Sequence, residues 1–258
     1  MSTVSYRIEA RCAVVTIERP ERRNAVDMAT ARALYDAFKR FDADEAADVA
    51  ILTGAAGTFC AGADLQAVAG GESGRRVVQG GDFGPMGAPR LMLGKPVIAA
   101  VEGYAVAGGL ELACWCDLRV AAEDAVFGVF CRRFGVPLID LGTIRLPRLI
   151  GQSRAMDLIL TGRPVVGPEA LQIGLANRLV PKGETLAAAL ELAAQLSASP
   201  QTTMRNDRLS ALEQWSLDWE AATQREVELG QASLRTGESV AGATRFTGGQ
   251  GRHGAFPS

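Results

Sequence analysis

A turn of small residues opens onto an apolar helix in the stretch Gly103–Asp117, GYAVAGGLELACWCD. The first amides of a helix have no partners inside it, and the helix dipole is positive there. Gly108 and Gly109 have no side chains, so a ligand oxygen can approach the backbone closely. Glu111 follows Gly108 by three residues and therefore lies on the same helical face. This spacing predicts an anion-accepting N–H group and a carboxyl group that face one small space.

A second turn of this kind, Phe59–Leu65 with the sequence FCAGADL, also precedes a helix pattern. Two such turns from separate βα units can place two amides around one oxygen, which is the geometry of an oxyanion hole. A glycine-rich turn alone is more often a tight packing feature, and a helical glutamate is usually on the surface. Glu111, however, is flanked by Leu110 and Leu112. Burying a carboxylate in so apolar a helix is costly unless it has a partner or a function.

The composition disfavours several other chemistries. The only histidine of the 258 residues is His253, near the end of the chain, which argues against a Ser-His-Asp or Cys-His enzyme and against histidine-bound metals. The formal charge of −2 gives no support for nucleic-acid or membrane-surface binding. The chain has no signal-peptide pattern and no apolar run long enough to span a membrane. Its five scattered cysteines fit reduced thiols, so we expect a cytoplasmic protein.

The elements that must position these turns alternate between strand and helix patterns. Apolar runs predict strands at residues 12–17, 48–53, 96–102 and 117–122, and helical periodicity predicts helices at 28–42 and 108–116. This alternation indicates an α/β fold with parallel strands. Residues 66–92 are rich in glycine and are expected to be a mobile loop that shapes the pocket. From residue 152 the chain is mostly helical, with one long pattern at 212–234, and its last ten residues are expected to be poorly ordered.

Four motifs, in order, resemble those of the enoyl-CoA hydratase/isomerase (crotonase) superfamily. They are ERPERRNAVD, FCAGADL, KPVIAAVEGYAVAGGLELACWCDL and LTGRPVVGPEALQIGLANRLV, and the similarity extends from about residue 5 to 245. The resemblance implies an α/β crotonase-like spiral of repeated ββα units at residues 1–195, containing the CoA site. It implies a C-terminal helical trimerisation region and tail at 196–258. The expected assembly is a homotrimer or a dimer of trimers.

The resemblance also implies roles for individual residues. The backbone N–H groups of Ala63 and Gly108 would hold the thioester oxygen of an acyl-CoA, and Glu111 matches the first of two catalytic glutamates. The substrate's CoA would lie near six further residues: Arg22, Arg23, Ala25, Ala61, Asp64 and Leu65. Fixed amides stabilise the negative charge that develops on this oxygen, and one such donor is typically worth about 3–4 kcal/mol. No metal and no cofactor besides the substrate's own CoA is expected.

The sequence departs from the family pattern at the second catalytic glutamate, which is replaced by Cys131. A thiol does not replace a carboxylate near neutral pH unless its pKa is strongly lowered. Asp140 is the next candidate, and a position at or near it carries the nucleophilic aspartate of 4-chlorobenzoyl-CoA dehalogenase, a relative. Asp140 either forms an acid/base pair with Glu111, with Cys131 a passive wall, or caps a helix that begins near Gly142.

Hydration of a 2-enoyl-CoA is the leading prediction for the reaction. Three alternatives stay open because of Cys131: an enoyl-CoA delta-isomerase that needs one carboxylate, a dehalogenase or hydrolase that uses Asp140 as nucleophile, and an acyl-CoA-binding protein without turnover. The expected partners are an acyl-CoA thioester and further copies of the chain, with neither nucleic acid nor membrane.

Overall fold

The computed structural model describes residues 2–72 and 80–250, and in this part of the chain six strands form the main sheet. Their order is β1 (Val4–Glu9), β2 (Cys12–Ile17), β3 (Val49–Gly54), β4 (Val97–Val101), β6 (Leu118–Ala122) and β9 (Arg178–Val180). Only the β1–β2 pair is antiparallel, and the remaining pairs are parallel. All residues of β2 and β4 are buried, as expected for parallel strands with both faces covered.

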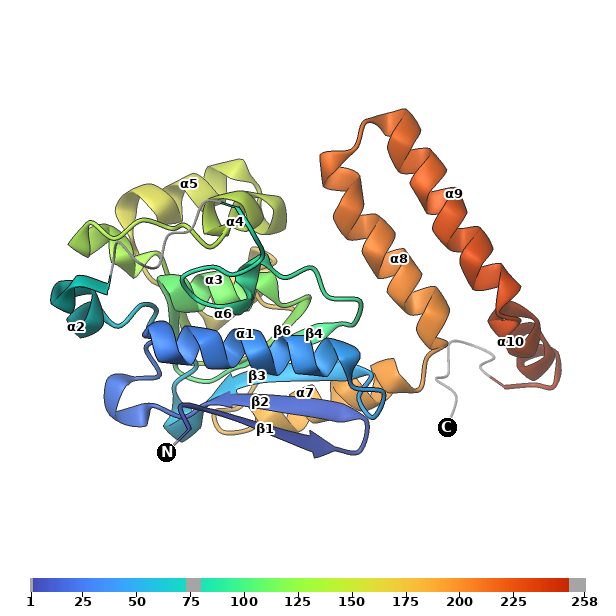
Figure 1. Ribbon diagram of the computed structural model, residues 1–258, viewed down its shortest axis with the longest axis horizontal. Helices are drawn as coiled ribbons and strands as arrows, with labels where there is room; N and C mark the ends of the chain where they lie inside the picture. Colours follow the sequence, from blue (N-terminus) through green and yellow to red (C-terminus); the bar gives the residue numbers. More distant parts are fainter. Residues whose placement is uncertain (1, 73–79, 251–258) are drawn as a thin grey trace.

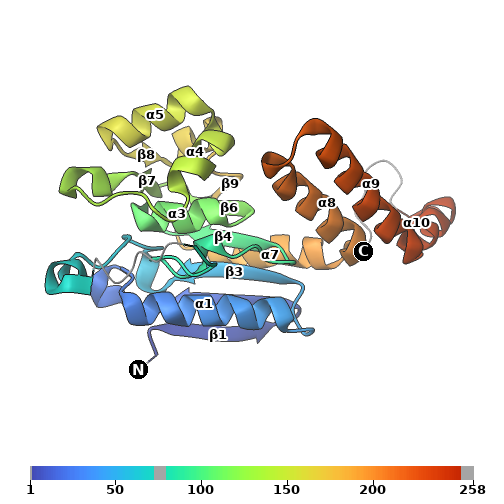
Figure 2. The same cartoon turned by 45° about the horizontal axis from the view of Figure 1, so that its top comes forward.

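Helices cover the two faces of this sheet (Figure 1, Figure 2). α1 (Met28–Ala43) packs Leu34 and Phe38 into a core with one set of alternating strand residues. α7 (Thr185–Ser197) packs Leu192 against the other set, which includes Val14. The period of two along each strand thus divides the apolar residues between two layers of core.

A second, three-stranded sheet consists of β5 (Tyr104–Val106), β7 (Val126–Gly128) and β8 (Val165–Val166). β4 leads into β5 and then α3 (Gly108–Trp115), and β6 leads into β7 in the same way. This is the ββα repetition that the resemblance implied. α4 (Gly142–Ile150), α5 (Gln152–Thr161) and α6 (Gly167–Gln172) complete this half of the molecule.

The C-terminal helices α8 (Gln201–Glu213), α9 (Trp219–Arg235) and α10 (Glu238–Thr247) stand to one side of the sheets (Figure 1). Ion pairs attach α8 to the body: Arg205 Nη2 lies 3.0 Å from Asp48 Oδ1, and Arg208 Nε lies 2.8 Å from Asp117 Oδ1. The single helix pattern at 212–234 is divided in the structure. Asp218 accepts a hydrogen bond from Ala221 N and begins a new helix, so the chain reverses there.

The predicted strands and helices lie where the sequence places them, and the structure adds β1 and β9 to the main sheet and the short strands β5, β7 and β8. Within the expected loop at 66–92, the chain forms α2 (Leu65–Ala67), a π-helical turn at Val68–Glu72 and a 3₁₀ turn at Ala88–Arg90. Residues 73–79 and the tail after residue 250 are outside the described part of the chain. No helix within residues 2–72 and 80–250 is long and apolar enough to cross a membrane.

Candidate active site

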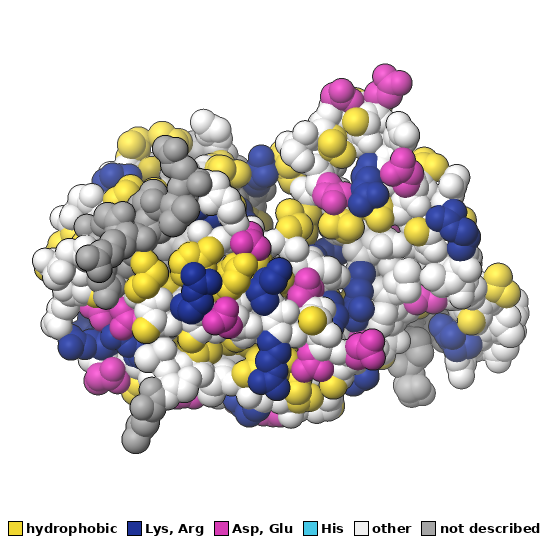
Figure 3. Space-filling view, viewed as in Figure 1, with side chains coloured by type: hydrophobic (Ala, Val, Ile, Leu, Met, Phe, Trp, Pro, Cys, Tyr) yellow, Lys and Arg dark blue, Asp and Glu magenta, His cyan; other side chains and the backbone are white. Residues whose placement is uncertain are grey.

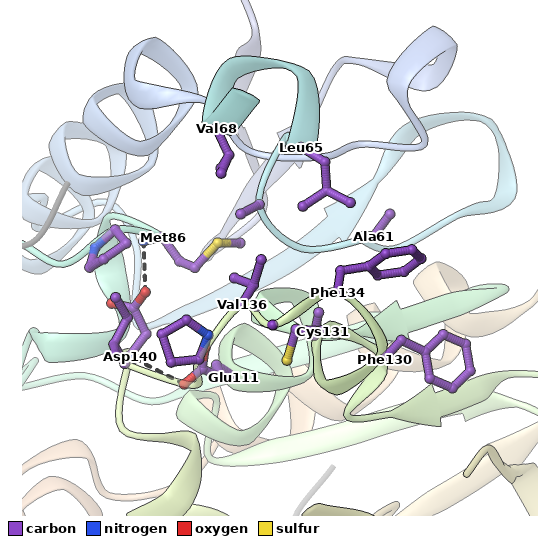
Figure 4. A pocket seen from close by; sticks show the side chains of 17 residues that line it. Ala61, Leu65, Val68, Met86, Glu111, Phe130, Cys131, Phe134, Val136 and Asp140 are labelled. Carbon is purple, nitrogen blue, oxygen red and sulfur yellow. Dashed lines mark hydrogen bonds between the residues drawn. The ribbon is translucent and has the colours of Figure 1, made fainter. Parts of the chain in front are cut away.

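A cavity of about 450 Å³ lies where the two small-residue turns meet (Figure 4). Its walls come from the turn after Phe59, from Met86, from the start of α3 and from the segment 130–140. Most of the lining is apolar, with Glu111 and Asp140 as its two carboxyl groups. Such a space, with few convergent polar groups, is typical of a small-molecule site.

Backbone pairing brings the two turns together. Cys60 N donates to Tyr104 O at 2.8 Å, and Val106 N donates to Cys60 O at 3.1 Å, so the chain before the first turn runs beside β5. Gly62 has φ of +96°, and a Cβ atom there would lie 2.9 Å from Gly108 N. Glycine is therefore required at this position to allow the close approach.

The predicted oxyanion residues, Ala63 and Gly108, both line the cavity. Neither amide nitrogen donates to a backbone group among the described residues. Ala107, just before α3, has the uncommon angles φ +55° and ψ −124°, and its nitrogen donates to Gly128 O at 2.8 Å. Unusual backbone angles held by surrounding structure are a frequent feature of functional sites.

Glu111 lies at the bottom of this cavity and is only 3% exposed. Its Oε1 accepts hydrogen bonds from Asp140 N and Gly142 N, both at 2.9 Å. Gly142 is the first residue of α4, and Leu141 before it is left-handed at φ +70°. Burial raises the pKa of Glu111 to about 8, with a contribution from the charge of Asp140, although the two backbone N–H groups oppose the shift. Because Oε1 already accepts two bonds, the carboxyl proton is best placed on Oε2.

Asp140 is 1% exposed, and its Oδ2 accepts a hydrogen bond from Met86 N at 2.9 Å. The N-cap residue of α4 is Leu141, which makes no side-chain capping bond, and the side chain of Asp140 does not cap the helix. The interpretation of Asp140 as a helix cap is therefore wrong. The carboxyl group that meets the first amide of α4 belongs instead to Glu111. The two carboxyl residues that the sequence singled out are thus brought together in one site.

Cys131 lies in the helical turn Phe130–Phe134 and contributes to the cavity wall. Burial raises the pKa of its thiol, and the charge of Glu111 adds to the shift. A thiol with a raised pKa is neutral near pH 7 and does not act as the missing carboxylate.

The predicted CoA-binding residues form two adjacent segments. Ala61 N donates to Arg23 O at 3.1 Å, and Asp64 N donates to Val26 O at 2.9 Å. Arg22 and Arg23 are exposed, whereas Ala25 is buried. Ala61 and Leu65 line the cavity. The carboxylate of Asp64 already has partners within the chain, because it caps α2 and its Oδ2 lies 3.0 Å from Arg19 Nη2.

Sequence reasoning missed Met86 and the aromatic wall formed by Phe130 and Phe134. Phe130 directly precedes Cys131 and Phe134 follows it by three residues, so their place in the chain was an available signal. Met86 had a weaker one, a position between Gly84 and Gly87 in the expected loop.

Comparison with known proteins shows the family to which the chain is similar. Residues 7–248 match the family described as enoyl-CoA hydratase/isomerase. An enoyl-CoA hydratase of Mycobacterium tuberculosis is 41% identical over 190 residues, which cover 72% of this chain and 71% of that protein. A mevalonyl-coenzyme A hydratase of Aspergillus fumigatus is 34% identical over 233 residues, covering 88% and 84%.

A crystal structure of an enoyl-CoA hydratase from Mycobacterium marinum superposes with a TM-score of 0.90 at 35% identity, covering 100% of this chain and 98% of that one. The chain belongs to the enoyl-CoA hydratase/isomerase family. The predicted family and its crotonase-like α/β fold are confirmed.

Proposed function

We propose that the protein adds water to the double bond of a 2-enoyl-CoA thioester. The observation that carries this proposal is the position of Glu111, a buried carboxyl group with a pKa near 8 in the same cavity as Ala63 and Gly108. A group with such a pKa exchanges protons readily near neutral pH. The hydratases among its relatives support the same reaction.

In this reaction the thioester oxygen lies between the N–H groups of Ala63 and Gly108. Water attacks C3 and loses one proton, electron density moves through C2 to the thioester oxygen, and C2 then gains a proton. The two amides stabilise the enolate more than the neutral thioester, which lowers the barrier. We assign proton donation at C2 to Glu111 and acceptance of the water proton to Asp140, since the negative charge of Asp140 favours the protonated form of Glu111.

The CoA portion of the substrate is proposed to lie along the exposed Arg22 and Arg23, beside Ala25, Ala61, Asp64 and Leu65. No resident cofactor or metal takes part. A cytoplasmic location is proposed as well, supported by five buried cysteines that form no disulfide.

Incubation with crotonyl-CoA tests the reaction. We expect loss of the absorbance of the conjugated thioester and a product heavier by one water, with both lost in Glu111→Gln. Glu220→Gln, which changes an exposed glutamate of α9, is the matched control and should retain activity. Conversion without gain of water would refute hydration.

Because the thiol at position 131 is neutral, the same assay has three other outcomes to distinguish. An isomerase needs one carboxyl group to move a proton, and would give a product of unchanged mass. A protein that binds acyl-CoA without turnover would leave the absorbance of the conjugated thioester unchanged and would still bind the thioester. Hydrolysis or dehalogenation through Asp140 would release free CoA or halide instead.

Self-association is proposed for the C-terminal helices. Apolar side chains remain on their surface, as Figure 3 shows for the projecting part of the molecule. The exposed residues are Trp215, Leu217, Trp219, Val227, Leu234, Val240 and Phe246. Exposed apolar side chains gathered on one group of helices are typical of a protein interface, and a homotrimer or dimer of trimers would cover them.

A further inference from the structure

A short turn carries Met86 into the cavity. Gly84 N and Gly87 O lie 3.3 Å apart, and Gly87 N donates to Gly84 O at 2.9 Å. At Gly87, with φ of +82°, a Cβ atom would lie 2.1 Å from Ala31 O of α1. The turn is therefore pressed against α1 on one side, and no residue with a side chain fits at position 87 without displacing backbone.

Asp140 holds the same turn from the other side. Its Oδ2 accepts the hydrogen bond from Met86 N, and a Cβ atom on Gly84 would lie 2.0 Å from its Oδ1. A hydrogen bond to a charged acceptor is about twice as strong as one between neutral groups. The carboxylate of Asp140 thus fixes the backbone of the residue whose side chain enters the site.

The side chain of Met86 packs on the predicted oxyanion residue. A Cβ atom on Gly108 would lie 2.5 Å from Met86 Sδ and 3.0 Å from its Cε, so the thioether occupies the space directly beside Gly108 Cα. Met86 is only 2% exposed and faces the cavity together with Cys131 and Val136 (Figure 4). With a thioester oxygen on Gly108 N, the acyl C2 is one bond beyond the carbonyl carbon and close to this thioether.

We infer that Met86 determines specificity at C2 of the acyl group, by excluding substrates with a methyl branch there. Asp140 has a positioning role in this selection, separate from proton transfer. The inference rests on the proposed function, because it needs the thioester oxygen at Gly108. Replacing Met86 by alanine opens the space that a branch would occupy.

The test compares kcat/KM for crotonyl-CoA and for its 2-methyl derivative. Met86→Ala should raise the branched-to-unbranched ratio about tenfold or more, since one methylene in an apolar pocket discriminates about 10–200-fold. Met92→Ala is the matched control, because Met92 is 59% exposed and is not part of the cavity lining. An unchanged ratio in Met86→Ala would overturn the inference.

Two substitutions at position 140 separate positioning from proton transfer. Asparagine retains an oxygen that accepts from Met86 N, so Asp140→Asn should lower kcat/KM for both substrates by the same factor and keep the native ratio. Asp140→Ala releases the turn and should raise the ratio toward that of Met86→Ala. Equal ratios in the two variants would exclude the positioning role.

A binding measurement keeps the inference distinct from the reaction. Calorimetric titration with butanoyl-CoA and 2-methylbutanoyl-CoA compares the same two shapes without turnover. If the native protein binds butanoyl-CoA but hydrates no enoyl-CoA, the proposed function fails. The inference about Met86 then stands or falls on whether Met86→Ala selectively improves the affinity for the branched thioester.

Discussion

The carboxyl group of Glu111 is subject to opposing influences. Burial and the charge of Asp140 favour the protonated form, whereas the N–H groups of Asp140 and Gly142 favour the ionised form. Burial dominates, so the pKa rises to about 8 instead of falling. The helix start at Gly142 therefore orients the group and moderates its shift, and the result is an acid that functions near neutral pH.

The pH dependence of kcat/KM follows from this value. Glu111 is assigned the proton donated to C2, so activity requires its protonated form. As pH rises through about 8, the group with a pKa near 8 loses that proton, and kcat/KM should fall about tenfold per pH unit above it. Initial rates with crotonyl-CoA from pH 6 to 10 measure this limb. A rise across pH 8 would show that the ionised form is active.

Stability should depend on the same proton. The ordinary pKa of this carboxyl is 4.5, whereas the folded value is about 8, so between these values the unfolded chain releases a proton that the folded one keeps. The stability present below pH 4.5 is therefore progressively lost up to pH 8. Glu111→Gln does not titrate and still accepts both backbone bonds.

We expect Glu111→Gln to be more stable than the native protein at pH 8, by roughly 1–3 kcal/mol, and similar to it at pH 5. Denaturant unfolding at the two pH values measures the difference. Glu220→Gln, which replaces an exposed carboxyl group, should show no such pH-dependent gain in stability. If Glu111→Gln is less stable than the native protein at pH 8, burial does not disfavour the ionised form of Glu111.

The predictability of individual residues follows their surroundings in the chain. Glu111 was identifiable because a carboxylate in an apolar helix is costly without a function. Asp140 was ambiguous, since an aspartate two residues before a helix start is as typical of a cap as of a catalytic group. The left-handed Leu141, which turns Gly142 N toward Glu111, has no sequence signal. Met86 depends on contacts from α1 and Asp140 that are distant in sequence.

At the scale of elements, the site depends on two turns that are more than 40 residues apart. Each was recognisable from its glycines and the helix pattern after it. Their convergence depends on pairing between Cys60 and Ala105, and the latter belongs to a strand of only three residues. So short a strand has too little periodicity to be read, which is why sequence patterns predicted both turns but not their contact. The expectation that the two turns meet at one oxygen came from the resemblance to the crotonase superfamily.

Gly62 offers a test of this convergence. In Gly62→Ala, the new methyl group would meet Gly108 N at 2.9 Å and Ala107 Cβ at 2.8 Å, which separates the two turns. We expect kcat to fall roughly 100-fold or more, as for the loss of an oxyanion donor. Crotonyl-CoA kinetics and circular dichroism distinguish a site defect from unfolding.

Gly71→Ala is the control for backbone strain. Gly71 has nearly the same φ, +93° against +96°, but open space around its Cβ position. Both variants bear the cost of a positive φ, and only Gly62→Ala alters the site. If Gly71→Ala loses as much kcat, strain and not the approach to Gly108 explains the effect.

The whole molecule divides into a body that contains the cavity and a helical extension. α7 ends at Ser197 and α8 begins at Gln201, close to the expected boundary at 195/196, although the existence of two domains stays a prediction. Charged contacts with Asp48 and Asp117 attach α8 to the body. Trp219, at the start of α9, is 89% exposed, a large cost for a chain that remains alone in water.

Assembly is the prediction that belongs to this scale. Light scattering after size-exclusion chromatography should give three or six times the 27.2 kDa of one chain. Val240→Glu, on α10, should lower that mass, because a charge buried in an apolar interface is costly. Leu160→Glu, on α5, is the matched control: both side chains are similarly exposed, 69% and 67%, but Leu160 is on the body. A native protein that elutes as a single chain would refute the trimer, and equal dissociation of both variants would refute the assignment of the interface to the C-terminal helices.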